Sequence, residues 1–204
     1  MKIDKYQKIK DNIYRIFLSN GEVLDLYEDV IIDNNLLYKK EIDNDLINKL
    51  NNENNYQIAY YQAIKYITVR LRSINEIKVY LEKKKISSDI IDATIDKLIK
   101  NNYLNDDIFT KAFIKDKLNF TSMGKYRLIK ELNNLKVSSD IINDNIAKID
   151  EDTWNQRMDK LINKYIASKK KYTGNTLKNK LYIYLVNLGY DKSLVISKLN
   201  EYDF

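Results

Sequence analysis

One short segment of the chain occurs twice: ISSDII at residues 86–91 returns as VSSDII at residues 137–142. The same 51-residue offset places apolar residues on apolar residues, for example Leu81 on Leu132. A further shift of 53 residues carries Leu132 to Leu185. Because periods of roughly 20–50 residues are typical of tandem structural units, the sequence predicts three copies of one unit.

Each copy is predicted to contain three helices, because its apolar residues recur at the spacing that lines one face of an α-helix. The predicted helices span residues 56–70, 74–85 and 88–101, then 106–118, 122–135 and 139–149, then 153–170, 175–188 and 192–202. With 4 Gly and no Pro among 204 residues, little interrupts them. Such units bury their apolar faces against their neighbours, so three copies predict an elongated, curved array.

The first 55 residues predict a smaller module. Runs of β-prone residues at 13–18 and 23–27 flank Asn20-Gly21, a pair that favours a two-residue hairpin turn because both central positions need positive φ. Short helices are expected at 28–34 and 43–51, followed by an Asn-rich linker at 51–55. The predicted fold class is therefore mainly α, with three tandem three-helix repeats and a small N-terminal β-hairpin and helix module. The predicted domains are 1–55 for the module and 56–104, 105–151 and 152–204 for repeats 1, 2 and 3.

The composition excludes several kinds of site. The chain has no Cys and no His, so thiol nucleophiles, disulfides, imidazole-based triads and Cys/His zinc sites are impossible. The acidic runs Asp106-Asp107 and Asp150-Glu151-Asp152 precede predicted helices, where the helix dipole favours negative side chains. We therefore expect no enzyme, no catalytic residue, no cofactor and no metal site. No apolar stretch approaches the roughly 20 residues of a membrane span, and we expect a cytoplasmic protein.

The chain has a net charge of +6. The basic surplus lies after residue 55, where the sequence has 27 basic and 18 acidic residues. Many of the basic residues recur near the junction of the first and second helices of each copy. If the copies stack with constant rotation, these junctions form a positive strip suited to phosphates or to an acidic protein groove. The predicted strip comprises Arg70, Arg72, Lys115, Lys117, Lys125, Arg127, Lys169, Lys170, Lys171, Lys178 and Lys180. The alternative is that each lysine is simply part of a solvated exterior.

Four tyrosines interleave with the third basic cluster, and exposed aromatic rings can stack on the bases of a single strand. These residues are Tyr165, Tyr172, Tyr182 and Tyr184. Their neighbours in the sequence are apolar, which favours core packing over stacking. Trp154 and Phe109 occupy corresponding helix starts and are predicted to anchor one copy to the next.

Three stretches together resemble the RecX regulatory family, modulators of the RecA recombinase. Residues 70–77, RLRSINEI, resemble the family's Arg-x-x-Ser-x-x-Glu-Leu element, with Ile77 in place of Leu. Residues 103–109, YLNDDIF, resemble its Tyr-(Leu/Ile)-Asx-Asp-x-x-Phe junction. Residues 124–132, GKYRLIKEL, match its Gly-x-x-(Arg/Lys)-Ile-x-x-Glu-Leu pattern, and the order of elements agrees over essentially the whole chain.

Glycine is replaced at several places where the family commonly has it. Asn102 stands before the junction segment, and Lys85 and Lys136 stand before the two Ser-Ser-Asp segments. Gly189 keeps the glycine in the third copy.

The resemblance implies a monomeric protein that binds RecA, both as the free protein and as its filament on single-stranded DNA. It also implies that binding inhibits recombinase, ATPase and coprotease activities, and it gives no role to a membrane. We expect the basic strip to supply the electrostatic part, with Lys169, Lys170 and Lys171 together with Arg70 and Arg72 as its strongest members. Two alternatives stay open: a helical repeat that binds single-stranded nucleic acid non-specifically, and a helical scaffold for another protein partner.

Overall fold

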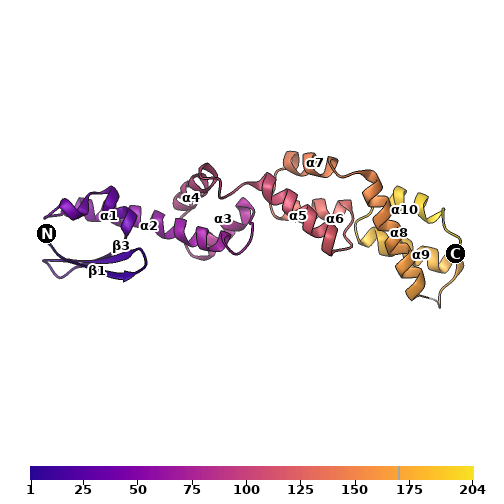
Figure 1. The fold of residues 1–204 in the computed structure, drawn as a ribbon, viewed down its shortest axis with the longest axis horizontal. Coiled ribbons are helices and arrows are strands. Elements are labelled where there is room, and N and C mark those ends of the chain that lie inside the picture. The colour runs from indigo at the N-terminus through magenta and orange to yellow at the C-terminus, as the bar shows by residue number, and fades with distance from the viewer. Residues whose placement is uncertain (170) are drawn as a thin grey trace. The chain divides into compact units, whose positions relative to one another are not determined.

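The computed structural model describes residues 1–169 and 171–204, and it is mainly helical with one small antiparallel sheet near the N-terminus (Figure 1). The chain divides into two compact units. Unit 1 comprises residues 1–71 and 76–104, and unit 2 comprises residues 72–75 and 105–204. Lys170, which the sequence places in the basic strip, lies outside the described residues.

Three strands form the sheet of unit 1 in the order β1 (Ile3–Lys10), β2 (Ile13–Leu18) and β3 (Val23–Tyr27). Alternation along β2 buries Ile16 and Leu18, and Leu24 and Leu26 are buried on β3, so one face of the sheet belongs to the core. The hairpin predicted between residues 13 and 27 is confirmed.

The turn of that hairpin has three residues, and the predicted two-residue turn is wrong. Leu18 N donates to Glu22 O at 2.9 Å, and Gly21 N donates to Leu18 O at 2.9 Å. Gly21 has φ +86° and Asn20 does not have positive φ. A three-residue loop needs the left-handed conformation at one position, and the glycine supplies it.

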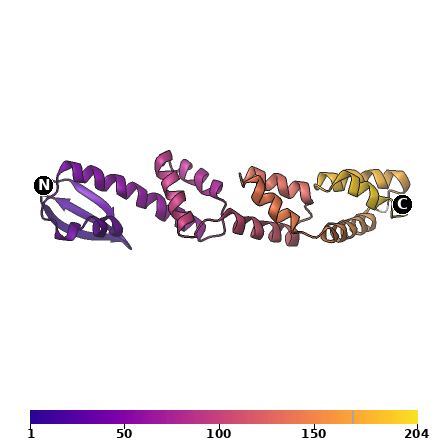
Figure 2. The ribbon, with the colours of Figure 1, turned by 90° about the horizontal axis from the view of Figure 1, so that it is seen from above.

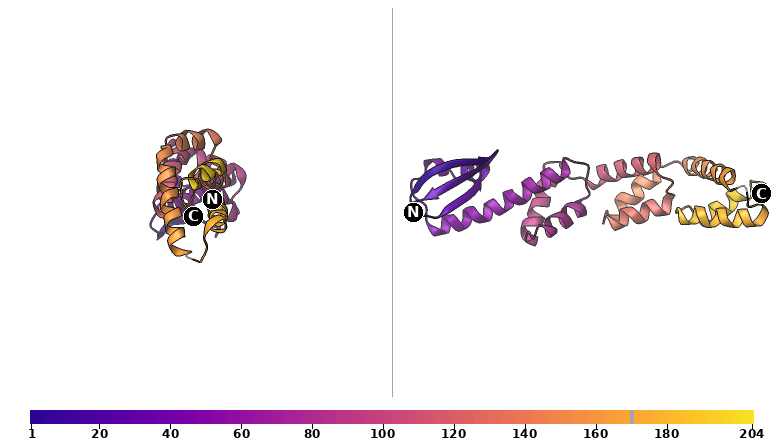
Figure 3. Two further views of the ribbon diagram at one scale, coloured as in Figure 1. Left: turned by 90° about the vertical axis from the view of Figure 1, so that its right-hand side faces the viewer. Right: turned by 90° about the horizontal axis from the view of Figure 1, so that it is seen from below.

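Two short helices, α1 (Glu28–Asp33) and the 3₁₀ helix η1 (Leu36–Tyr38), lead into the long helix α2 (Asn44–Ile67). The predicted linker at 51–55 is wrong, because these residues lie inside α2. Asn54 shows why: its amide nitrogen donates to Asp25 O at 2.9 Å, and its oxygen accepts from Tyr27 N at 2.8 Å. These bonds fasten the middle of α2 to β3, so tertiary contacts outweigh the weak helix propensity of the Asn run (Figure 3).

The second half of α2 continues into the first three-helix repeat. α2 packs on α4 (Ser88–Lys100), and α3 (Ile74–Lys83) precedes α4 (Figure 2). Leu81, Ile91 and Leu98 are fully buried there. The predicted helices at 74–85 and 88–101 are therefore confirmed to within a few residues.

Unit 2 contains the second and third repeats. Its helices are α5 (Asp106–Phe120), α6 (Lys125–Asn134), α7 (Ser139–Ala147), α8 (Glu151–Ser168), α9 (Gly174–Asn187) and α10 (Lys192–Leu199). One hydrophobic core runs through both repeats and includes Phe109 on α5 and Trp154 on α8. Both rings are buried in this shared core, and the anchoring of one copy to the next by these two residues stays a prediction.

The second helix of each repeat ends in the same way. After α6, Lys136 N donates to Asn133 O at 2.9 Å and Val137 N donates to Leu132 O at 3.3 Å, with Lys136 at φ +59°. This is the Schellman pattern, in which a left-handed residue closes the helix. Lys85 and Gly189 close α3 and α9 with the same two bonds, at φ +61° and +90°. In this chain, these three positions, where the resemblance implies glycine, are therefore left-handed helix ends, and lysine occupies two of them.

The second and third repeats meet through their backbones. Gly124 N donates to Leu188 O at 2.8 Å, and Tyr126 N donates to Gly189 O at 2.9 Å. A Cβ atom on Gly124 would lie 2.5 Å from the carbonyl carbon of Gly189. Arg157 adds a clamp, since its guanidinium donates to Leu118 O and, at 2.7 Å, to Thr121 O. These contacts make repeats 2 and 3 one packed body.

Candidate binding surface

A cluster of lysines surrounds Tyr172 in the connection between α8 and α9. Lys180 Nζ lies 4.5 Å from the centre of the Tyr172 ring, and Lys171 Nζ lies 5.0 Å from it. A hydrogen bond from Lys171, and then the charges of Lys171, Lys180 and Lys169, lower the pKa of the Tyr172 phenol. None of these three lysines forms an ion pair with a carboxylate in the described part of the chain. We call Lys169, Lys171, Tyr172 and Lys180 the α8–α9 cluster.

A second group of predicted strip residues lies on α5 and α6. Lys117 Nζ lies 3.1 Å from one oxygen of Glu131, and Arg127 Nε lies 3.7 Å from the other. One carboxylate therefore ties two cations from two helices together. We call Lys117, Arg127 and Glu131 the α5–α6 group, whose net charge is +1, whereas the three lysines of the α8–α9 cluster keep +3.

The two arginines of the first predicted junction fall in different units. Arg70 belongs to unit 1, where its Nη2 lies 2.5 Å from Glu76 Oε1 and its Nη1 donates to Leu71 O at 2.8 Å. Arg72 belongs to unit 2 and is partly buried. The charge of Arg70 is therefore already paired with a carboxylate of this chain, and binding a partner through Arg70 would compete with that ion pair.

The remaining strip residues occupy separate places in unit 2. Lys115 is exposed on α5, and Lys125 is the exposed first residue of α6. Lys178 donates to Asn200 Oδ1 at 2.8 Å and lies 5.9 Å from the centre of the Phe204 ring. The continuous strip itself stays a prediction, because it depends on how the two units are placed.

The tyrosines near the third basic cluster pack mainly against the core of unit 2. Tyr165 and Tyr184 have ring centres 5.0 Å apart, and both, with Tyr172 and Tyr182, are partly buried against that core. Their expected packing role is confirmed. Tyr172 differs from the others because lysines also surround it.

The acidic runs serve helix starts, as predicted. Asn105 caps α5 by accepting from Asp107 N at 2.9 Å and Ile108 N at 3.0 Å, and Asp150 caps α8 by accepting from Asp152 N at 3.1 Å. Asp106 accepts from Ile74 N at 2.9 Å. Within residues 1–169 and 171–204, no group of acidic side chains is arranged to hold a metal ion.

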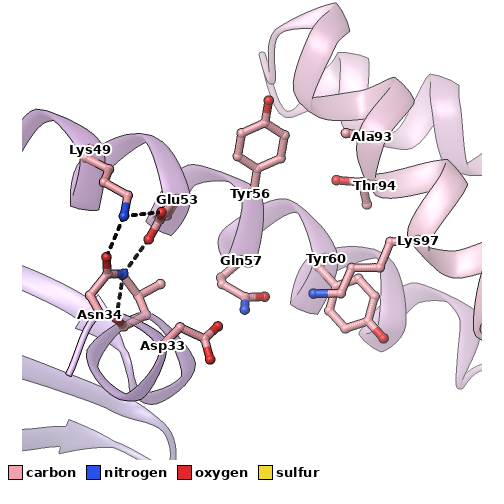
Figure 4. A pocket seen from close by; sticks show the side chains of 11 residues that line it. Asp33, Asn34, Lys49, Glu53, Tyr56, Gln57, Tyr60, Ala93, Thr94 and Lys97 are labelled. Carbon is pink, nitrogen blue, oxygen red and sulfur yellow. Dashed lines mark hydrogen bonds and ion pairs between the residues drawn. The ribbon is translucent and has the colours of Figure 1, made fainter.

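Unit 1 has a polar cavity of about 290 Å³ between α1, α2 and α4 (Figure 4). Lys49, Glu53 and Asn34 bond to one another at one end, with Glu53 accepting from Asn34 Nδ2 at 2.5 Å. At the other end Lys97 lies 4.4 Å from the centre of the Tyr60 ring. Two acidic and two basic side chains line the cavity, so it offers no net charge to an anionic partner.

Sequence analysis missed a groove between α5 and α7 that is lined by Lys111, Lys115 and Lys148. The i, i+4 spacing of Lys111 and Lys115 places both on one face of α5, which is the signal that could have indicated it. Lys148 could not be added from sequence, because its place beside α5 depends on how α7 packs.

None of the helices in the described ranges combines the length and the apolar character that a membrane span requires.

Comparison with known proteins gives consistent similarities. A family model described as "RecX, first three-helix domain" matches residues 59–98. The chain is 32% identical over 153 residues to "Regulatory protein RecX" of Finegoldia magna, covering 73% of this chain and 74% of that protein. It is 28% identical over 190 residues to "Regulatory protein RecX" of Lactobacillus gasseri, covering 92% of this chain and 70% of that protein.

Two solved structures share the fold. A crystal structure described as regulatory protein RecX superposes with a TM-score of 0.85, covering 98% of this chain and 99% of that one at 17% identity. The crystal structure of RecX from Lactobacillus salivarius gives a TM-score of 0.67, covering 72% and 96% of the two chains at 19% identity. At these identities the superpositions describe architecture alone.

Proposed function

The chain belongs to the RecX family of regulatory proteins, and from that premise we propose that it binds RecA and inhibits it, acting on the free protein and on its filament on single-stranded DNA. The inhibited activities are recombinase, ATPase and coprotease activity. The protein acts by occupying its partner and carries no catalytic step of its own.

The α8–α9 cluster is the observation in this chain that best supports a charged binding surface. Lys169, Lys171 and Lys180 gather around one phenol, and among the described residues none of them forms an ion pair with a carboxylate. Such a site attracts an anionic partner over several ångströms and raises the rate of encounter. The α5–α6 group contributes less, because Glu131 already neutralises one of its two cations.

Single-stranded DNA is the second candidate partner, and Tyr172 is the observation that favours it. Aromatic rings among basic residues are the usual way of holding an unpaired strand, since bases stack on the ring while lysines meet phosphates. Tyr172 is partly buried, so only part of its ring is available to a base. The cluster therefore supports contact with DNA as an addition to RecA binding.

The decisive experiment titrates the full chain into RecA that hydrolyses ATP on saturating single-stranded DNA, while fluorescence anisotropy follows binding to the same DNA without RecA. We expect inhibition at protein concentrations that leave the DNA free in the anisotropy measurement. The stoichiometry then separates capping of filament ends from filling of the groove. Absence of inhibition, or inhibition that extra DNA abolishes, would contradict the proposal.

A matched pair of triple variants tests the surface. Lys169→Gln, Lys171→Gln and Lys180→Gln together should raise the half-inhibitory concentration by about tenfold at low salt, because exposed charge pairs contribute up to about 1 kcal/mol each. Lys39→Gln, Lys40→Gln and Lys100→Gln remove the same charge from exposed positions of unit 1 and should change it by less than about twofold. If both triple variants raised the half-inhibitory concentration equally, the α8–α9 cluster would contribute only through the net charge of the protein, and the proposed surface would be wrong.

A further inference from the structure

The groove between α5 and α7 in unit 2 has a volume of about 300 Å³. Its walls include three lysines and no acidic residue: Lys111 and Lys115 come from α5, and Lys148 directly follows α7. A cavity of this size is at the lower end of the range for small binding sites. This volume is large enough for one side chain and its immediate neighbours.

Internal contacts fix one end of the groove. Asp107 accepts from Asn145 Nδ2 at 2.8 Å and from Lys111 Nζ at 2.5 Å, and these two bonds hold the pKa of the Asp107 carboxyl below its ordinary value. The Asp107 carboxylate thus bridges α5 and α7 and sets the spacing of the two walls.

Lys115 and Lys148 complete the charge of the groove. Neither forms an ion pair among the described residues, whereas Lys111 pairs with Asp107. The charge of Lys148 also lowers the pKa of the Asp107 carboxyl, although the two side chains form no salt bridge. The electrostatic complement of this groove is therefore a group with two or more negative charges.

The floor of the groove is aliphatic. Ile114 is 5% exposed and Leu118 is partly buried, and both line it. No aromatic side chain is among its lining residues. Because unpaired bases bind by stacking on aromatic rings, this combination favours a peptide over a nucleic acid. The contrast with the α8–α9 cluster, where a tyrosine sits among the lysines, is direct.

We propose that the groove docks an acidic segment of a partner protein. One aliphatic side chain of that segment packs on Ile114 and Leu118, and carboxylates on either side of it meet Lys115 and Lys148. The inference rests on the proposed function in one respect, since the segment is assigned to the protein that this chain regulates. The binding chemistry itself is independent of that assignment.

The test is an NMR titration of the full ¹⁵N-labelled chain with the peptide acetyl-Asp-Asp-Asp-Leu-Asp-Asp-Asp-amide. We expect the largest amide shifts at Ile114, Leu118 and Lys148. A peptide with Asn in place of Leu should bind more weakly, because it loses the apolar contact. Lys115→Gln with Lys148→Gln should weaken binding of the Leu peptide by about fivefold, while Lys160→Gln, which removes an exposed lysine of α8 away from the groove lining, leaves it within about twofold.

Three outcomes would overturn the proposal: shifts spread over the basic surface, no dependence on Leu, or the same residues shifted more strongly by an eight-residue oligothymidine. The RecA assay separates this inference from the proposed function. If the chain inhibits RecA but the peptide produces no shifts at the groove, the groove assignment is wrong and the function stands. If the peptide binds at the groove and RecA is not inhibited, the function is wrong and the docking chemistry stands.

Discussion

The α8–α9 cluster and the α5–α6 group look alike in sequence, but their charged side chains have different partners in the structure. Both lie near the junction of the first and second helices of a repeat, and both are rich in Lys or Arg. In the α5–α6 group Glu131 meets Lys117 and Arg127, whereas the lysines around Tyr172 meet an aromatic ring. The available charge of a basic motif therefore depends on which side chain the next helix brings to it.

The packing of repeat 2 on repeat 3 provides the strongest way to disturb this comparison. Gly189 has φ +90°, and a Cβ atom there would lie 2.5 Å from Arg127 Cβ and from Arg127 N. Gly189→Ala should lower the free energy of unfolding of unit 2 by about 2–4 kcal/mol, since it combines backbone strain with overpacking. The same substitution should displace Arg127 from Glu131.

Gly21→Ala is the matched control for this variant. Gly21 has φ +86°, and nothing lies within 4 Å of a Cβ atom placed on it. Gly21→Ala therefore adds only the strain of a left-handed backbone, so the free energy of unfolding should fall by about 1–2 kcal/mol. Chemical denaturation of both variants measures the difference, and equal losses would mean that the close approach to Arg127 contributes nothing.

Much of this architecture could be predicted from the sequence because it depends on local periodicity. The recurring segments at 86–91 and 137–142 place the third helix of the first two repeats, and α4 and α7 begin within one residue of the predicted positions. The strand β1 was missed, since most of its side chains are exposed and it is held by long-range contacts: it pairs with β2, and the Tyr6 hydroxyl donates to Leu36 O at 3.0 Å. The continuity of α2 was missed because Asn54 is fixed by backbone groups of β3, more than 25 residues away.

The candidate surface could be predicted less completely for the same reason. Sequence analysis identified Lys117 and Arg127 but not their shared partner, because Glu131 reaches Lys117 across two helices. It identified Lys169, Lys171 and Lys180 as basic but could not show that they converge on Tyr172. Residue type is a property of the sequence, and neutralisation is a property of packing.

Glu131→Gln sharpens the comparison by giving the α5–α6 group its full charge. Removing this carboxylate releases Lys117 and Arg127, so affinity for an oligothymidine strand should rise by about fivefold at low salt. The gain should shrink as salt is added. The variant has one more cation available to a phosphate, so it releases more counterions when it binds, and its affinity falls more steeply with salt. Fluorescence anisotropy across a salt series measures both effects.

The double variant Lys117→Gln and Arg127→Gln is the control for this prediction. It removes both cations and leaves the Glu131 carboxylate, so the net charge of the group changes from +1 to −1 and the affinity for the strand should fall by more than the Glu131→Gln variant raises it. An affinity that the double variant leaves unchanged would show that the α5–α6 group does not contact the strand.

The smallest effect concerns the Tyr172 phenol, which reports on the α8–α9 cluster directly. The hydrogen bond from Lys171 and the nearby lysine charges stabilise the phenolate, so the pKa of Tyr172 lies below its ordinary value of 10.0. Lys171→Gln removes the largest of these causes and should raise that pKa. A bound phosphate strand should raise it as well, because its negative charge offsets the same lysines.

Tyrosine ¹³Cζ shifts followed through a pH titration, with Tyr172→Phe to assign the signal, measure both changes. The α5–α6 group serves as the internal reference, since Glu131→Gln should leave the pKa of Tyr172 unchanged while it alters strand affinity. A Tyr172 pKa that rises with the strand in the wild type but not in the Lys169→Gln, Lys171→Gln and Lys180→Gln variant would place the phosphates at the α8–α9 cluster. If the pKa of Tyr172 did not change when the strand was added, the strand would not contact the α8–α9 cluster. The difference in charge between the two groups would then be irrelevant to DNA binding.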